Sequence, residues 1–185
     1  MIEVRVNGIF ITQTQASGII LKEQSGERAL PIVIGEYEAQ SIALALEHLN
    51  PPRPITHDLM ANILRMLDLS LDSVIITELK DNTYYAIIRL RRDVEIIEID
   101  ARPSDAIALA VRLDSSIYVK EQVMDEASYI PEDKDDIQKS FLFKSETNEK
   151  NLNALKKQLK EAVEKEDYEK AARLRDEIKR LESGS

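Results

Sequence analysis

The sequence predicts an α+β fold, in which two copies of a β-β-β-α unit form one two-layer domain and a C-terminal helical hairpin follows. Three observations support this prediction: short segments of alternating apolar residues, an internal repeat, and a change of composition after residue 131. The hydrophobic fraction of 43% is enough to form a buried core. Three strands and one helix leave apolar surface uncovered, so two such units sharing a core would complete the domain.

The first unit is predicted to contain three strands and a helix, and a second helix follows it. Strands are expected at residues 1–11, 19–21 and 30–34, with Pro31 favouring an edge or the start of a strand. Apolar residues at a spacing of three and four predict a helix over residues 36–49. Thr56 is expected to cap the next helix, which continues to residue 67.

The second unit is predicted from similar patterns. Strands are expected at residues 73–79, 83–90 and 94–99, followed by a helix from Pro103 and a short strand at 117–119. The segment 42–46 (IALAL) matches the segment 107–111 (IALAV) at an offset of 65 residues. The expected domains are therefore residues 1–131, a charged linker at 132–150, and a hairpin at 151–182.

The turn at residues 100–105 (DARPSD) brings three charged side chains to a predicted helix N-terminus. Pro103 suits a first helical turn, and Ser104 or Asp105 could bind the free amides there. Because a helix N-terminus attracts anions, Arg102 and Ser104 are predicted to bind phosphate. The alternative is an Arg102–Asp105 ion pair that only stabilises the turn.

Other polar residues suggest a catalytic site at the same corner. Asp100 and Asp105 are candidate ligands for a hard cation, Mg²⁺ or Mn²⁺. The predicted catalytic residues are Arg102 and Asp105, with His57 as base and Asp58 as its orienting partner. The alternative for His57 and Asp58 is favourable polarity at a helix N-terminus, and the same applies to Glu36 and Glu38 at the corresponding corner of the first unit.

Charge and composition limit the classes of function. The formal net charge of −9 disfavours long-range attraction of nucleic acid, so a nuclease would need a local basic patch or a bound cation. Arg89, Arg91 and Arg92 are the densest basic cluster, and Arg89 and Arg91 would face the same side of a strand, where they could follow a nucleic-acid backbone. The alternative is pairing with Asp93, Glu95 and neighbouring acids. The absence of cysteine excludes disulfides and thiolate chemistry. With no apparent signal peptide or membrane span, we expect a cytoplasmic protein.

The C-terminal segment is predicted to form two amphipathic helices that bind a protein partner or a second copy, giving a homo-oligomer. Short helices are marginally stable alone, so folding back onto the same chain is the alternative. The predicted contact residues are Leu155, Leu159, Tyr168, Ala171, Leu174, Ile178 and Leu181.

Several segments closely resemble the bifunctional nuclease domain family, in the family's order. They are residues 26–35 (GERALPIVIG), 38–39 (EA), 53–59 (RPITHDL), 81–86 (DNTYYA) and 100–108 (DARPSDAIA). This resemblance implies hydrolysis of RNA and DNA, an activity attributed to plant members of the family.

The segment 167–176 (DYEKAARLRD) resembles the UVR motif, the helical hairpin shared by the B and C subunits of bacterial excision repair. This second resemblance implies contact between proteins. Two functions therefore remain open, a metal-assisted nuclease and a non-catalytic adaptor that binds a protein or a small anionic ligand.

Overall fold

The computed structural model describes residues 1–12, 15–131, 157, 159, 170, 174 and 175. The chain divides into two compact units, Met1–Glu132 and Asp133–Ser185. The described residues of the second unit are helical. Most of the predicted partner-binding residues of the hairpin lie outside the described residues; of those that are described, Leu159 is half-buried and Leu174 is buried.

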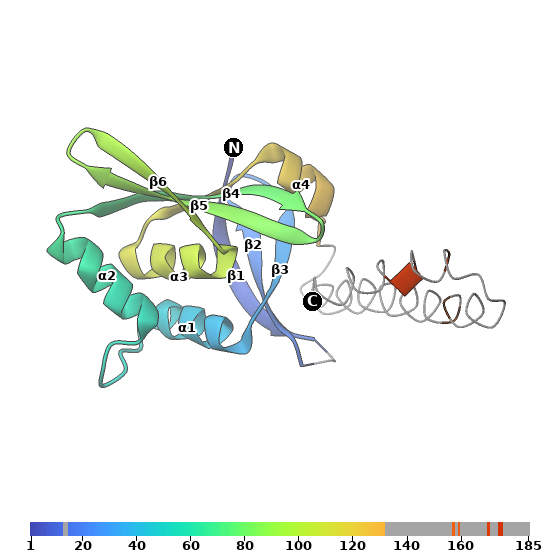
Figure 1. The fold of residues 1–185 in the computed structure, drawn as a ribbon, viewed down its shortest axis with the longest axis horizontal. Coiled ribbons are helices and arrows are strands. Elements are labelled where there is room, and N and C mark those ends of the chain that lie inside the picture. Colours follow the sequence, from blue (N-terminus) through green and yellow to red (C-terminus); the bar gives the residue numbers. More distant parts are fainter. Residues whose placement is uncertain (13–14, 132–156, 158, 160–169, 171–173, 176–185) are drawn as a thin grey trace. The chain divides into compact units, whose positions relative to one another are not determined.

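The described part of the first unit is a mixed α+β structure with seven strands and four helices, drawn in Figure 1. In chain order these are β1 (Ile2–Ile11), β2 (Ser17–Glu23), β3 (Ala29–Ile34), α1 (Glu36–Leu46), α2 (Thr56–Met66), β4 (Ser70–Lys80), β5 (Thr83–Arg92), β6 (Glu95–Ala101), α3 (Pro103–Leu113), β7 (Ser116–Val119) and α4 (Glu121–Ala127).

The strands form one sheet in the order β3-β2-β1-β7-β4-β5-β6. Neighbouring strands are antiparallel except β4 and β7, which are parallel. Three consecutive strands therefore lie on each side of β7, in mirrored order. Such an order is compatible with two β-β-β-α copies, but the duplication itself stays a prediction. Pro31 lies on the edge strand β3, as predicted.

The core is centred on α3, where residues 106–110 are at most 1% exposed. One side of α3 packs against β4 and β5, and the other side packs against α1 and α2 (Figure 1). The small side chains of Ala106, Ala108 and Ala110 suit a helix that is covered from both sides. This position brings the N-terminus of α3 close to helices that precede it by some 50 residues in the sequence.

Two helix boundaries differ from the prediction. Helix α1 ends at Leu46 rather than residue 49, and His48 adopts a positive φ of 53°. Helix α2 is capped at Ile55 rather than Thr56, because the Asp58 carboxylate accepts the Ile55 N–H at 3.0 Å. A difference of one residue is usual at a helix end, whereas α1 ends three residues early because His48 leaves the helical backbone conformation.

Helix α4 was not predicted. The helix is short, and its buried Val123 and Met124 belong to the main core. Arg28 donates hydrogen bonds to Glu121 and Asp125 at 3.1 and 3.0 Å, which attaches α4 to the β2–β3 hairpin. Tertiary contacts of this kind stabilise a helix too short to persist alone.

The basic cluster on β5 pairs with acids, as the alternative interpretation expected, although the partners differ. Arg89 pairs with Glu98, and Arg91 pairs with Asp72. None of the helices in the described residues combines the length and apolar character needed to cross a membrane.

Candidate functional site

Arg102 lies at the N-cap of α3 with an extended backbone, and its side chain is 67% exposed. Nε and Nη2 donate hydrogen bonds to Oδ2 and Oδ1 of Asp105, at 2.8 and 3.1 Å. Nη2 also lies 3.0 Å from Oε1 of Glu38, in the first turn of α1. The Arg102–Asp105 ion pair expected as an alternative is therefore present, and the guanidinium also links the N-termini of α1 and α3.

The glycine at the start of α1 permits the position of Glu38. A Cβ atom added to Gly35 would lie 2.1 Å from Oε2 of Glu38, far closer than such atoms approach in real structures. A side chain at position 35 would therefore require the Glu38 carboxylate to leave the position in which it faces Arg102. The strand-to-helix corners that precede α1 and α3 thus meet through an ion pair.

His57 is buried, with 7% of its surface exposed, and both ring nitrogens have partners. Nδ1 lies 2.8 Å from Oγ of Ser41 on α1, and Nε2 lies 3.1 Å from Oδ1 of Asp105. A carboxylate only accepts hydrogen bonds, so Nε2 carries a proton and donates it to Asp105. In the neutral ring, Nδ1 is then an acceptor for the Ser41 hydroxyl.

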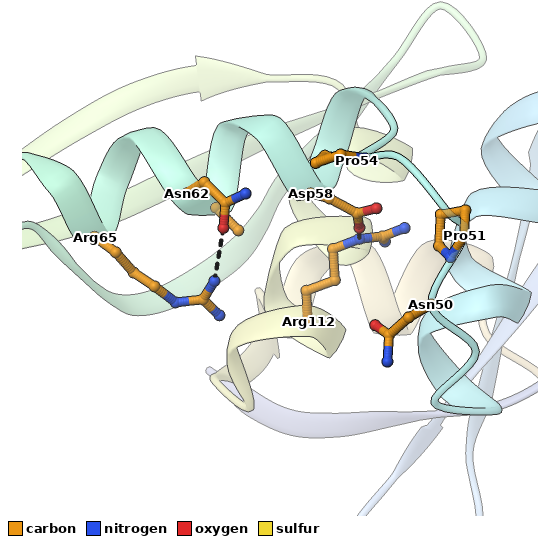
Figure 2. Close-up of a pocket in the computed structure, with 8 residues that line it drawn as sticks. Asn50, Pro51, Pro54, Asp58, Asn62, Arg65 and Arg112 are labelled. Atoms are coloured by element: carbon orange, nitrogen blue, oxygen red, sulfur yellow. Dashed lines mark hydrogen bonds and ion pairs between the residues drawn. The ribbon is translucent and has the colours of Figure 1, made fainter.

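Arg112, near the end of α3, has a side chain that is only 8% exposed. Its Nε donates to Oδ1 of Asp58 at 2.6 Å, a contact that Figure 2 shows between α3 and α2. Its Nη1 donates to the carbonyl of Ala108, and its Nη2 donates to both the carbonyl and the hydroxyl of Ser41. The guanidinium therefore joins Asp58 to Ser41.

These contacts form one hydrogen-bonded chain across three helices, which we call the buried network. In order its members are Asp58, Arg112, Ser41, His57, Asp105, Arg102 and Glu38. The neutral tautomer of His57 with its hydrogen on Nε2 satisfies every hydrogen bond from Arg112 to Arg102, because each donor then faces an acceptor.

One side of the buried network borders a cavity of about 490 Å³, which we call the Arg102 cleft. The cleft lies between the first turns of α1, α2 and α3. Its lining residues are Tyr37, Glu38, Gln40, Ser41, Leu44, Pro51, Ile55, Thr56, His57, Arg102 and Asp105. The exposed guanidinium, the buried imidazole and a tyrosine that is 82% exposed thus share one cleft.

The electrostatics keep the acids of the buried network ionised. Burial raises the pKa of Asp105, but hydrogen bonds from Arg102 and His57 outweigh it and lower the pKa below its usual value. Burial raises the pKa of Asp58 as well, and the hydrogen bonds from Arg112 and the Ile55 amide reverse this. A hydrogen bond to Asp105 raises the pKa of Arg102, which therefore keeps its positive charge in the cleft.

The structure brings together three of the predicted catalytic residues, namely Arg102, Asp105 and His57. It places Asp58 elsewhere: adjacent helical residues point about 100° apart, so Asp58 faces Arg112 while His57 faces Asp105. The predicted partner of His57 is therefore wrong, and Asp105 takes that place.

Two other predicted residues do not line the Arg102 cleft. Ser104 is 6% exposed, and Asp100 is exposed on β6. Both oxygens of Asp105 accept hydrogen bonds from protein groups. The described residues contain no group of three or more histidines and acids that could hold a metal ion. Asp100 and Asp105 as arranged thus do not fit a divalent cation, and the Mg²⁺ or Mn²⁺ site stays a prediction.

The sequence interpretation missed Ser41, Arg112 and Tyr37. A serine and a tyrosine inside a helical pattern resemble ordinary surface residues. The signal that could have identified Ser41 and Arg112 is their polarity at positions adjoining the apolar stripe, Ser41 beside Ile42 and Arg112 four residues after Ala108.

The fold and cleft define an α+β domain with an arginine and a histidine–carboxylate pair at the meeting point of three helix N-termini. Residues 19–132 match the family model described as bifunctional nuclease domain, so the chain belongs to that family. All members of the buried network lie within the matched range. Residues 149–184 match the UvrB/UvrC motif.

Similar proteins include a bacterial and a plant relative. A protein of Mycobacterium tuberculosis described as uncharacterized is 42% identical over 135 residues, covering 72% of this chain and 80% of the relative. Bifunctional nuclease 1 of Oryza sativa subsp. japonica is 28% identical over 109 residues, covering 57% of this chain and 33% of the relative. The similarity thus spans one third of the rice protein.

Proposed function

We propose that this chain is a nuclease that hydrolyses phosphodiester bonds of RNA or DNA, with the Arg102 cleft as its site. The observation that carries the proposal is the exposed guanidinium of Arg102 beside the buried His57–Asp105 pair, in a cleft large enough for a nucleotide. Membership of the bifunctional nuclease domain family and the name of the rice relative support the same activity.

Arg102 is proposed to bind the phosphate. Its Nε and Nη2 are used by Asp105 and Glu38, while the hydrogens on Nη1 have no partner among the described residues. Because Asp105 and Glu38 hold the planar guanidinium in place, little order is lost when those donors meet a phosphate oxygen. Such donors stabilise the negative charge that grows on phosphate oxygens in the transition state.

His57 is proposed to act as the base. Since Nε2 already donates to Asp105, only Nδ1 can take a proton, and Ser41 occupies it. In the proposed step a water in the cleft gives its proton to Ser41, which passes its own proton to Nδ1. The resulting hydroxide attacks phosphorus as the bond to the leaving oxygen breaks. The leaving oxygen keeps the bonding electron pair and takes the proton back from His57 by way of Ser41.

Tyr37 supports a substrate with unpaired bases. Its ring is 82% exposed at the edge of the cleft, where it is available to stack on a base.

The proposal is tested by digestion of labelled RNA and single-stranded DNA, each with Mg²⁺, with Mn²⁺ and with EDTA. Hydrolysis that is lost in His57→Ala but kept in Arg92→Ala, an exposed residue outside the cleft, supports it. No hydrolysis by the native chain under any of the three conditions contradicts it.

A second function is favoured by the match of residues 149–184 to the UvrB/UvrC motif. We propose that residues 151–182 bind a protein partner or a second copy of the chain through Leu155, Leu159, Tyr168, Ala171, Leu174, Ile178 and Leu181. This adaptor role is compatible with the nuclease, and it stands alone if the nuclease proposal fails. We also propose that the first unit of the chain arose by duplication of a β-β-β-α unit.

A further inference from the structure

A second cavity, of about 280 Å³, borders the other end of the buried network, at Asp58 and Arg112. We call it the Arg65 cavity. Figure 2 shows Arg65 and Asn62 on α2, Arg112 on α3 and Asn50 on the loop after α1 around this space. The cavity shares Pro51 with the Arg102 cleft, but none of its polar lining residues belongs to that cleft.

The groups that remain free to bind a ligand in this cavity are mainly donors. Nη1 of Arg65 donates to Oδ1 of Asn62 at 3.1 Å, which directs the Asn62 amide so that its NH₂ group stays available. The remaining N–H groups of Arg65 have no partner among the described residues. Asp58 is the one carboxylate lining the cavity, and its two oxygens already accept from Arg112 and the Ile55 amide.

The local charge also favours an anion. Two guanidinium groups and one carboxylate line the cavity, an excess of one positive charge in a chain whose net charge is −9. Arg112 is nearly inaccessible to water and is neutralised by Asp58, so the excess charge is that of Arg65. The volume falls slightly below the usual range of about 300–1,000 Å³ for drug-sized ligands, which limits the ligand to a small group.

We propose that the Arg65 cavity binds a phosphate group, with Arg65 as the main contact and Asn62 as a second donor. An arginine fork and an amide are both common partners of phosphate oxygens. This site goes beyond the proposed nuclease function, because none of its donors belongs to the Arg102 cleft. Since the two cavities meet at Pro51, the phosphate is either a free anion or part of a strand that also enters the Arg102 cleft.

The test measures binding by the full chain and needs no catalysis. Inorganic phosphate is titrated by NMR, and a fluorescein-labelled single-stranded oligonucleotide is titrated by fluorescence anisotropy in EDTA. We expect Arg65→Ala to weaken the binding of at least one probe about tenfold or more, and Arg65→Lys to have an intermediate effect. Arg92→Ala is the matched control, as an exposed arginine that lines neither cavity, and is expected to change binding less than twofold.

Each outcome has a distinct meaning. Weaker binding of both probes in Arg65→Ala supports a site for free phosphate, and weaker binding of the oligonucleotide alone supports a site for a phosphate of the strand. Equal affinities of Arg65→Ala and Arg92→Ala for both probes overturn the proposal. Failure of the nuclease proposal would appear instead as absent hydrolysis, whatever the residue at position 65.

Discussion

Nη2 of Arg112 lies 3.0 Å from Oγ of Ser41, and this hydrogen bond connects α3 to the hydroxyl group that faces His57. Because Arg112 can only donate, it occupies one of the two lone pairs of the Ser41 oxygen, and the hydroxyl hydrogen is free to point to Nδ1 of His57. The Asp105 carboxylate can only accept a hydrogen bond, so Nε2 of His57 must carry a hydrogen. Asp105 therefore fixes the tautomer of His57 on α2, and the hydrogen bond from Arg112 to Ser41 is compatible with it.

The first prediction is that neutral His57 carries its proton on Nε2. Two-bond ¹H–¹⁵N spectra of the full chain at alkaline pH report the tautomer directly. The chain has two histidines, and the exposed His48 serves as the internal control. In Ser41→Ala we expect the preference at His57 to weaken while His48 is unchanged. A native His57 protonated on Nδ1 would show that the buried network is assigned wrongly.

The second prediction concerns the stability of the pair between Arg112 and Asp58. Replacing Arg112 by Met removes one hydrogen-bond partner from Asp58 and one from Ser41, and it leaves a partly buried carboxylate without its positively charged partner. We expect a loss of about 2–4 kcal/mol in the free energy of unfolding, measured with urea. Arg92→Ala is expected to change stability by less than about 0.5 kcal/mol. Adding Asp58→Asn should recover part of the loss, and a loss below about 1 kcal/mol in Arg112→Met would contradict the structure.

The third prediction follows from the lowered pKa values of Asp58 and Asp105, whose usual value is 3.8. A carboxyl group with a pKa that is lower in the folded state stabilises the fold above its unfolded pKa. This contribution disappears as the pH falls through the folded pKa. Stability should therefore hold down to about pH 4 and fall below it.

Urea midpoints at a series of acidic pH values test this dependence. Asp105→Asn should flatten the decline, because the variant lacks one of the carboxyl groups whose pKa is lowered in the folded state. Asp93→Asn is the matched control, since Asp93 is exposed and its positive φ of 51° suits asparagine equally well. Equal slopes for Asp105→Asn and the native chain would count against the role of this ion pair in stability.

The fourth prediction concerns the segment that matches the UvrB/UvrC motif. Deleting residues 151–185 should lower the mass per particle in sedimentation, or remove a partner that copurifies with the chain. An apolar helical face that binds another chain is the physical reason. The double variant Tyr168→Ala, Leu174→Ala in the full chain should reproduce the effect of the deletion. An unchanged sedimentation profile and unchanged partners would refute the adaptor role.

The sequence was sufficient to predict the strands and the position of Arg102, because these depend on local patterns. Alternating apolar residues marked all seven strands to within a few residues, and Pro103 after a strand marked the start of α3. Arg102 and Asp105 are three residues apart, so their ion pair follows from helix geometry alone.

The partners of His57 could not be predicted, because they depend on how three helices pack. Ser41 and Asp105 are 16 and 48 residues away in the sequence, and no local pattern relates them to position 57. Asp58 seemed the natural partner because it is adjacent in the sequence, yet the helix turns it toward Arg112. Helix α4 was missed for the same reason, since contacts with Arg28 and the core support it.

The most direct test of the proposed nuclease is the rate at which Arg102→Ala hydrolyses labelled single-stranded RNA, compared with the native chain and Arg92→Ala. Because the side chain of Arg102 is largely exposed, its loss should cost about 1 kcal/mol of stability or less, so the variant should fold. We expect hydrolysis to slow about 100-fold or more in Arg102→Ala and to be unchanged in Arg92→Ala. Equal rates in all three proteins would contradict the assignment of the cleft.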